Sequence, residues 1–480
     1  MKIILGICPY VFDETYPAGM NRPINKRGFN LIQGPTPCLG LLYIASVLKN
    51  EGHRVSYFEG AFYSLYDLKD LIRKEIPDLV GFLITAPFWD LSKIAIREIK
   101  KSFPNLKIAV GGRHVDLIQK KILEECQEVD FACFGDGEIV FKNLCRCLKN
   151  NSDLNEVKGL IFREGNKIIR NQPEDFIQNL DEIPFPDYSL IEFKRYTPSI
   201  GHYLRLPNMT MISSRGCPYH CLFCTSDDTL RERSIFNIIT EIEFLVKKYG
   251  LKDILFYDED LTENKDRMDE FCSRLIEKKF DLTWSGNARS DNVANMDDKL
   301  LKKMKKSGCW KLLFGLESGV QKTLDTLRKE FTVKESRIAI EKTVKAGIRP
   351  YCTFIFATPG ETYEEGLKTI EFALSLKGIE FAKFLIFTPF PGSEVYKEIE
   401  KYGRIVAPLS KMTTNKITFV PHSMTKEQVE KLYFHAIRRF YRRPQYILQR
   451  FFHIGSYDEL CQNIRGFKAF ALVKEEICKS

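Results

Sequence analysis

Three closely spaced cysteines are the residues of this sequence best suited to chemistry. Cys217, Cys221 and Cys224 lie in the stretch SSRGCPYHCLFCTSDD, four and three residues apart. Thiolates grouped in this way bind either zinc or an iron–sulfur cluster. A zinc site needs a fourth protein ligand, and His220 is poorly placed for it because its backbone lies between two of the cysteines. Three thiolates suit an iron–sulfur cluster in which one iron stays open to a substrate or cofactor.

The composition predicts a globular protein of two or three domains, because 480 residues are too many for one ordinary core. The longest apolar stretch, residues 79–89, is too short to span a membrane, and MKIILGICPY is typical of a first strand rather than a signal peptide. A cytoplasmic location is therefore expected, with the 14 cysteines mostly reduced. This disfavours a disulfide among the three cysteines and leaves a chance grouping as the other alternative. The net charge of +9 points to an anionic partner.

Residues 1–150 alternate apolar strand patterns with amphipathic helical ones, as in a parallel sheet covered on both faces. The prediction is an α/β domain of the Rossmann-like, flavodoxin-like type. Glycines that let a ligand approach the backbone follow the expected strands, where such sheets bind ligands: Gly111, Gly112, Gly135 and Gly137. The alternative is that these glycines only form tight turns.

Residues 151–204, with prolines 173, 184 and 186, predict a linker with a small hairpin. Residues 205–400 then predict six strands in alternation with helices, as in a partial (βα)6 TIM-like barrel, and residues 401–480 a small C-terminal helical region. Polar residues gather where the expected barrel strands end, which is the active-site face of such barrels: Asp258, Glu259, Asp260, Arg289, Glu317 and Ser318.

The CxxxCxxC spacing with Phe223 before the last cysteine resembles the radical S-adenosylmethionine enzymes, over residues 205–395. The resemblance implies a four-iron four-sulfur cluster on Cys217, Cys221 and Cys224. It also implies S-adenosylmethionine as cofactor, cleaved by one electron to a 5′-deoxyadenosyl radical that abstracts hydrogen from the substrate. An electron donor such as flavodoxin or ferredoxin is implied as a partner.

The same resemblance assigns the remaining cofactor-binding residues. The YDED stretch, with Asp258, Glu259 and Asp260, stands where the family's second-strand motif meets the methionine amino group, although many members have glycines and a glutamate there. Arg289 and the GLES stretch, with Glu317 and Ser318, would border the methionine carboxylate and the ribose, and Phe223 the adenine. No residue is assigned as catalytic acid or base.

Residues 30–145 look like the cobalamin-binding domain that precedes many radical S-adenosylmethionine enzymes, through PCLGLLYIASVLKNEGHRV, VGGRH and DFACFGDGE. Gly111, Gly112, Gly135 and Gly137 would then contact cobalamin. The cobalt-ligating motif DxHxxG is missing, because His53 and His114 lack the matching aspartate and glycine. Cobalamin is therefore expected without a protein histidine on cobalt. The alternative is a domain that keeps the fold and has lost the cofactor.

Residues 431–452 carry six basic residues and no acidic one, among apolar residues at near-helical spacing. Such a helix can meet a membrane surface or an anionic substrate, or it can pack on the barrel with a solvated basic face. No nucleic-acid-binding module is present, so nucleic acid is not expected as a partner.

The sequence as a whole predicts a radical S-adenosylmethionine enzyme, cobalamin-dependent, that modifies an unactivated carbon of a bulky, partly apolar substrate such as a lipid, hopanoid or porphyrin. Methylation, cyclisation and ring contraction stay open. The alternatives are a cobalamin-independent radical oxidoreductase and a non-catalytic iron–sulfur or cobalamin sensor. The expected location is cytoplasmic, with contact to a membrane surface as an option.

Overall fold

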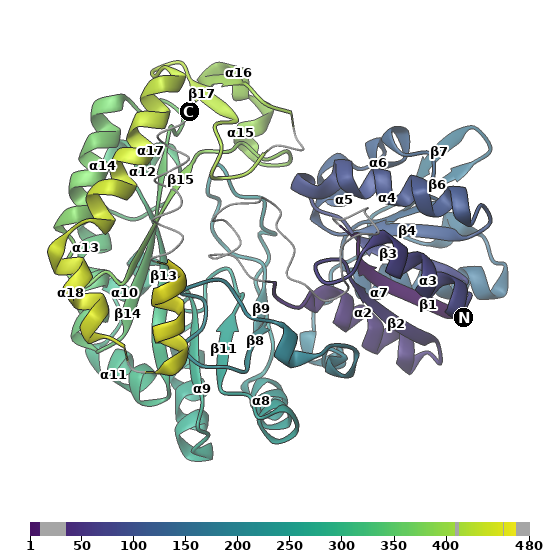
Figure 1. Cartoon of the computed structure of the whole chain (residues 1–480), viewed down its shortest axis with the longest axis horizontal. Coiled ribbons are helices and arrows are strands. Elements are labelled where there is room, and N and C mark those ends of the chain that lie inside the picture. The colour runs from purple at the N-terminus through teal and green to yellow at the C-terminus, as the bar shows by residue number, and fades with distance from the viewer. Residues whose placement is uncertain (10–34, 409–411, 455, 467–480) are drawn as a thin grey trace. The chain divides into compact units, whose positions relative to one another are not determined.

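The computed structural model describes residues 1–9, 35–408, 412–454 and 456–466 (Figure 1). The chain forms two compact units, one built mainly from residues up to Glu192 and the other from Phe193 onward. Each unit has a predominantly parallel sheet covered by helices, which confirms the predicted α/β class. No helix in the described ranges is long and apolar enough to cross a membrane.

The sheet of the first unit has the order β2-β1-β3-β4-β5-β6-β7. Its first five strands are parallel and in flavodoxin-like order, as predicted, whereas β6 and β7 are antiparallel. The strands are β1 (Lys2–Ile7), β2 (Arg54–Glu59), β3 (Leu79–Leu83), β4 (Lys107–Gly111), β5 (Phe131–Cys133), β6 (Leu160–Glu164) and β7 (Lys167–Arg170).

Helices cover both faces of this sheet because successive strand residues point to opposite sides. Ile4 belongs to the apolar cluster with residues of α3 and α4, while Ile3 and Leu5 belong to the cluster with residues of α2 and α7. The helices of the unit are α2 (Leu39–Asn50), α3 (Leu65–Glu75), α4 (Trp89–Ser102), α5 (Arg113–Ile118), α6 (Lys121–Glu125) and α7 (Gly137–Asn150).

The segment expected as a linker, residues 151–204, is mostly part of the first unit. It does contain the expected hairpin, but β6 pairs with β5 and so extends the sheet. The chain after the hairpin is fastened to α2: the Ser46 hydroxyl donates to the Phe185 carbonyl at 2.5 Å, and Lys49 pairs with Asp187 at 2.5 Å. The structure therefore has one boundary, after Glu192, in place of the two domain boundaries expected at residues 150 and 204. Although the composition is proline-rich and typical of a linker, the pairing of β6 with β5 makes this segment part of the first unit.

The second unit contains six parallel strands in the order β8-β11-β12-β13-β14-β15, the partial barrel that the sequence predicted. These strands are β8 (Asn208–Met211), β11 (Asp253–Phe256), β12 (Thr283–Ala288), β13 (Cys309–Glu317), β14 (Arg349–Phe356) and β15 (Phe381–Ile386). Between them lie α8 (Ile235–Tyr249), α9 (Lys265–Lys278), α10 (Ser290–Ala294), α11 (Asp298–Lys306), α12 (Gln321–Thr326), α13 (Val333–Lys345) and α14 (Tyr363–Ser375).

Smaller elements follow the barrel: α15 (Glu394–Lys397), α16 (Ile399–Tyr402), the antiparallel pair β16 (Gly403–Ile405) and β17 (Phe419–Pro421), then α17 (Lys426–Tyr441) and α18 (Pro444–Phe452). The basic stretch 431–452 is thus two helices, because Pro444 begins a new helix rather than continuing the old one. Residues 467–480 of the expected C-terminal region lie outside the described ranges.

Several charges of this basic stretch turn inward, which the sequence did not reveal. Arg450 forms an ion pair with Glu380, which is completely buried at the start of β15. Arg443 donates to the Leu374 carbonyl at 3.1 Å, and Arg439 pairs with Glu371 on the surface. The C-terminal region is therefore a structural part of the barrel, and its basic face is smaller than the composition indicates.

We predict that Glu380→Ala destabilises the second unit by about 3–5 kcal/mol, because Arg450 and Arg349 then lose a buried carboxylate partner. Glu371→Ala, which removes the exposed partner of Arg439, is the matched control and is expected to cost about 1 kcal/mol or less. Urea unfolding, with limited proteolysis of the C-terminal helices as the readout, measures the destabilisation caused by each substitution. Equal effects of the two substitutions would contradict the buried role of Glu380.

Candidate active site

The three cysteines lie in a loop that leaves the carboxyl end of β8 and returns to the same place. Its two ends are joined by a short antiparallel pair, β9 (Ser214–Arg215) and β10 (Arg231–Glu232). Gly216 has φ +82°, and a Cβ there would overlap the Thr229 carbonyl oxygen on the returning strand. The Cys217 amide donates to the Asp227 carbonyl at 2.8 Å. The chain therefore crosses itself tightly just before the first cysteine, and only glycine fits.

A buried carboxylate holds the entry to this loop. Asp258, at the end of β11, accepts hydrogen bonds from the Ser213 amide at 2.6 Å, from the Ser214 amide at 3.1 Å and from the Ser213 hydroxyl. Arg267 donates to the Ser213 carbonyl at 2.8 Å. Burial raises the pKa of Asp258, while these donors lower it. The sequence placed Asp258 at the methionine amino group, but both its oxygens are used to anchor the loop.

The three thiols interact electrostatically, and this changes the pKa values of Cys217 and Cys224. Burial, together with the charges of Asp260, Cys221 and Cys224, raises the pKa of Cys217 to about 11. The Ser226 amide donates to the Cys224 sulfur at 3.3 Å, and the Cys224 amide donates to the Cys221 carbonyl at 2.9 Å. Metal coordination removes the thiol protons, so these residues fit a group that neutralises several thiolates together.

A single-ion site is not formed by these side chains. Within the described ranges no three His, Cys, Asp or Glu side chains are arranged to hold one metal ion. The corners of a four-iron cluster are separate atoms, so its thiolates need not converge on one point. The donor set therefore fits the cluster with three cysteine ligands.

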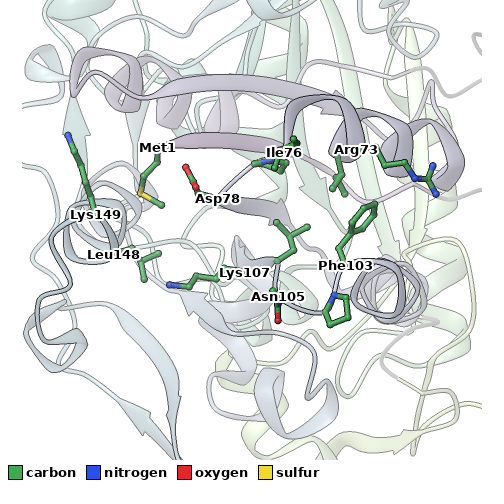
Figure 2. A pocket seen from close by; sticks show the side chains of 13 residues that line it. Met1, Arg73, Ile76, Asp78, Phe103, Asn105, Lys107, Leu148 and Lys149 are labelled. Carbon is green, nitrogen blue, oxygen red and sulfur yellow. The ribbon is translucent and has the colours of Figure 1, made fainter.

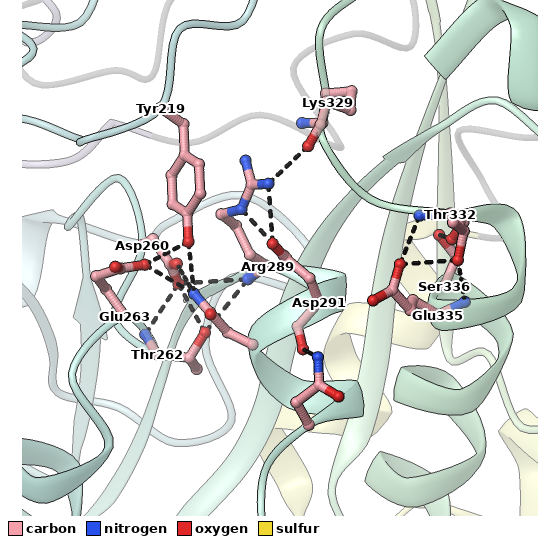
Figure 3. A network of polar contacts seen from close by, with 12 residues as sticks. Tyr219, Asp260, Thr262, Glu263, Arg289, Asp291, Lys329, Thr332, Glu335 and Ser336 are labelled. Atoms are coloured by element: carbon pink, nitrogen blue, oxygen red, sulfur yellow. Dashed lines mark hydrogen bonds and ion pairs between the residues drawn. The ribbon is translucent and has the colours of Figure 1, made fainter. Parts of the chain in front are cut away.

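A polar network lies beside the loop (Figure 3). Tyr219, between the first two cysteines, donates to Glu263 at 2.6 Å. The Asn292 amide donates to Asp260 at 2.8 Å and to Glu263 at 2.9 Å. Asp260 also accepts from the Thr262 amide at 2.9 Å, and burial raises its pKa. The loop is thereby tied to the carboxyl ends of β11 and β12, as expected for a βα-barrel active site.

Arg289 belongs to the same network and is held from several sides. Its Nε and Nη2 each donate to Asp291 at 3.1 Å, and Nη2 donates to the Lys329 carbonyl at 2.6 Å. Its guanidinium carbon lies 3.3 Å from the centre of the Tyr219 ring. The structure therefore brings Arg289 to the cysteine loop with its charge already paired to Asp291.

Glu259 and Phe223 also lie near the cysteines. Glu259 is exposed between the buried Asp258 and Asp260. Burial raises the pKa of Cys224, and the charges of Cys221 and Glu259 add to this rise. The Phe223 ring meets the Phe387 ring edge-on at 6.5 Å. These two side chains give the mouth of the barrel an acidic point and an aromatic surface beside the thiols.

The two residues of the GLES stretch differ in placement. Glu317 is buried, has φ +58°, pairs with Lys329 at 3.2 Å and accepts from the Thr353 hydroxyl at 3.3 Å. Ser318 is completely buried and its hydroxyl lies 3.0 Å from that of Thr369 on α14. Glu317 therefore faces the cysteine-loop side, whereas Ser318 joins β13 to α14.

Sequence reasoning missed Tyr219, Glu263, Asn292 and Lys329. Tyr219 lies inside the cysteine stretch, and its position between two ligands was a usable signal. Asn292 is in α10, one turn after Arg289, and depends on the fold for its contacts. Lys329 follows α12 in a charged stretch, LRKEF, that is typical of solvated surface.

The glycines of the first unit lie at the carboxyl edge of its sheet. Gly112 has φ +101° and Gly135 φ +86°, a conformation that favours glycine at both positions. A Cβ at Gly135 would meet no atom within 4 Å, so the backbone is open there. Asp116 accepts from the Gly135 amide at 3.0 Å and joins the loops after β4 and β5. An open backbone at this edge fits a bound cofactor.

Gly111 and Gly137 have more ordinary surroundings. A Cβ at Gly111 would lie 3.6 Å from the Cys133 carbonyl, a normal contact. A Cβ at Gly137 would lie 2.9 Å from Ile44 on α2. Gly137 therefore allows α7 to pack closely on α2, a role that the sequence did not predict.

Two histidines of this unit, His53 and His114, lie in surroundings that do not match a cobalt-ligand motif. His53 lies at the amino edge of the sheet, where its Nδ1 is 3.3 Å from the Met1 amino group. His114, on α5, is 2% exposed beside Trp89, and burial lowers its pKa to about 4. Neither is held by the aspartate and glycine of a DxHxxG motif.

A hollow of about 880 Å³ lies elsewhere in the first unit (Figure 2). It is lined by Met1, Arg73, Ile76, Asp78, Phe103, Lys107 and Lys149. These residues stand at the amino edge of the sheet, and none of the expected site residues is among them. Parallel sheets of this kind bind ligands at the opposite edge.

Comparison with known families accounts for both units. Residues 211–373 match the radical SAM superfamily, and residues 29–145 match the B12 binding domain. An uncharacterized methyltransferase of Pyrococcus horikoshii is 32% identical over 90% of this chain and 93% of its own length. The chain belongs to the cobalamin-dependent radical S-adenosylmethionine enzymes.

Two further proteins are similar to this radical enzyme. The anaerobic magnesium-protoporphyrin IX monomethyl ester cyclase of Cereibacter sphaeroides is 28% identical over 86% of this chain and 68% of its own length. The cobalamin-dependent radical enzyme OxsB, with aqua-cobalamin and S-adenosylmethionine bound, has a TM-score of 0.65 and 18% identity. The likeness covers 83% of this chain but only 55% of OxsB, and it shows a shared fold.

The family confirms the predicted cofactors: a four-iron four-sulfur cluster, S-adenosylmethionine and cobalamin. When bound, the cluster supplies the electron that cleaves the sulfonium and releases the 5′-deoxyadenosyl radical. Cys217, Cys221 and Cys224 would hold it, and Asp258 and Gly216 fix the course of the loop. Gly112 and Gly135 would border cobalamin in the first unit.

We predict that Gly216→Ala lowers the iron content of anaerobically reconstituted protein to less than half, because the new Cβ overlaps the Thr229 carbonyl and φ +82° disfavours alanine. The matched control is Gly250→Ala, which has φ +65° but nothing within 4 Å of its Cβ. The triple variant Cys217→Ala, Cys221→Ala, Cys224→Ala marks complete loss. Iron analysis and visible absorption measure all three, and full iron in Gly216→Ala would show that the loop tolerates the change.

Proposed function

We propose that this enzyme transfers a methyl group to an unactivated carbon of a bulky, partly apolar substrate. Support comes from the Pyrococcus horikoshii relative, which is named a methyltransferase and matches over nearly its whole length. The apolar character of the substrate is supported by the partly exposed Phe223 ring next to Cys224. It is further supported by the porphyrin ester in the name of the Cereibacter sphaeroides cyclase.

The second candidate reaction is cyclisation or ring contraction without methyl transfer, favoured by the similarity to the cyclase. Lipids, hopanoids and porphyrins are the proposed substrate classes. Flavodoxin or ferredoxin is the proposed electron donor. Both candidate reactions use the same radical, so the fate of the methyl group separates them.

The products of S-adenosylmethionine distinguish these reactions. Reductive cleavage leaves methionine and 5′-deoxyadenosine, whereas methyl donation leaves S-adenosylhomocysteine. Reduced, cobalamin-loaded enzyme with an extract from cells that lack the gene is expected to form both nucleosides, and to move a labelled methyl group into an extractable apolar product. 5′-Deoxyadenosine without S-adenosylhomocysteine or label would favour cyclisation, and no 5′-deoxyadenosine from iron-loaded enzyme would contradict the radical activity itself.

We also propose that α17 and α18 let the enzyme approach an anionic membrane, where an apolar substrate would be found. Arg438 and Arg442 are exposed on successive turns of α17 and the residues after it. On α18, Ile447 and Leu448 are each 57% exposed and Phe452 is 77% exposed. Basic charge next to exposed apolar side chains is the composition of an interfacial helix.

We predict that Arg438→Glu with Arg442→Glu abolishes binding to vesicles that contain anionic lipid, since each arginine contributes about 1 kcal/mol near such a surface. Added salt is expected to weaken binding of the unaltered enzyme. Lys299→Glu with Lys302→Glu, the same charge change on exposed positions of α11, is the control and should leave vesicle binding in place. If the unaltered enzyme ignores such vesicles at low salt, the membrane contact is wrong.

A further inference from the structure

Two buried cations lie against the cysteine loop, Arg289 and Lys329. The segment that carries Lys329 is docked directly on the loop, because the Leu222 amide donates to the Leu327 carbonyl at 3.0 Å. The Lys329 carbonyl accepts from Arg289 at 2.6 Å (Figure 3). The position of Lys329 is therefore fixed relative to the loop through its backbone on two sides.

The backbone around Lys329 adopts a conformation that non-glycine residues rarely take. Arg328 has φ +54° and Glu330 has φ +57°, so left-handed residues flank Lys329 on both sides. Such positions are strained and concentrate at functional sites. Their effect here is to separate two neighbouring cations: Arg328 reaches the surface and pairs with Glu394 at 2.5 Å, while Lys329 turns inward and is 8% exposed.

The two buried cations differ in what they can still bind. Arg289 gives Nε and Nη2 to Asp291 and to a backbone carbonyl, and it stacks on Tyr219. Lys329 has one hydrogen-bond partner in the described part of the chain, Glu317 at 3.2 Å. An ammonium has three donors, so two of them remain for a ligand.

The surroundings of the Lys329 ammonium place it at the cysteines. It lies 5.8 Å from the centre of the Phe223 ring, and Phe223 directly precedes Cys224. Glu259, which follows β11, is the exposed acid near the cysteines. The amino-acid end of S-adenosylmethionine carries one ammonium and one carboxylate, so it needs an acid for the ammonium and a cation with free donors for the carboxylate.

We propose that Lys329 is a positioning residue that receives the carboxylate of S-adenosylmethionine, and that Arg289 orders the cysteine loop instead. Glu317 holds the Lys329 ammonium in place for this contact. The family resemblance assigned Arg289 to the carboxylate border, whereas Lys329 reaches the site from the α12–α13 connection, between two left-handed residues.

The test compares two ligands on iron-loaded protein: S-adenosylmethionine and its decarboxylated analogue, which lacks only the carboxylate. Lys329→Met is expected to weaken binding of S-adenosylmethionine by about 10- to 100-fold, the range for a lost charged hydrogen bond, and binding of the analogue by less than about threefold. Lys329→Arg is expected to keep the preference for S-adenosylmethionine. Arg328→Met, at the left-handed neighbour whose side chain points outward to Glu394, should leave both affinities unchanged.

Equilibrium dialysis under anaerobic conditions measures both affinities for the unaltered enzyme and for each variant, with iron content determined on each sample. Equal weakening of both ligands by Lys329→Met at full iron content would overturn the proposal, because the lysine would then act on the loop or the adenosine. If the methionine variant loses iron, Lys329→Gln, which keeps two N–H donors without the charge, gives the same comparison. If the unaltered enzyme binds the two ligands equally, the proposal for Lys329 is also overturned. That result would not contradict the proposed radical activity.

Discussion

The site depends on one buried set of hydrogen bonds, which the Asp258 carboxylate accepts from the backbone and side chain where β8 leads into the cysteine loop. A carboxylate that accepts two amides and a hydroxyl in a buried place forms strong, charge-assisted hydrogen bonds, and its loss would leave buried amides unpaired. Three thiolates can share one cluster only if the loop that carries them begins and ends at fixed points. Asp258 and the β9–β10 pair supply those points before any metal is present.

Because side chains alternate in direction after β11, three consecutive acidic residues have different roles. Asp258 and Asp260 are buried and Glu259 between them is exposed, as expected of extended backbone. Asp258 serves the loop entry, and Asp260 orders Asn292 and the Arg289 backbone. Only Glu259 stays accessible at the mouth, so a short acidic stretch yields two structural carboxylates and one that can meet a ligand.

The sequence predicted those features whose cause is local. The six barrel strands follow from alternating patterns, and the cluster cysteines from their spacing, which belongs to one loop. The sequence did not predict features with long-range causes: β6 pairs with β5 and so joins the hairpin of residues 160–170 to the first unit, and the buried Glu380 draws Arg450 inward. Lys329 was missed for the same reason, because its direction is set by left-handed backbone and not by composition. The division of the basic stretch at Pro444 has a local cause that the sequence prediction overlooked.

An incomplete barrel has an open edge, and this explains the form of the C-terminal region. β15 ends the six-stranded sheet, and its backbone groups need partners. The Tyr441 hydroxyl donates to the Ala382 carbonyl at 2.7 Å, and the Ile386 amide donates to the Thr414 carbonyl at 2.7 Å. Covering this edge takes one face of α17 and turns Arg443 and Arg450 inward. The exposed Arg438 and Arg442 are what the barrel leaves for an anionic surface, so any membrane contact is a secondary use of helices that the fold requires.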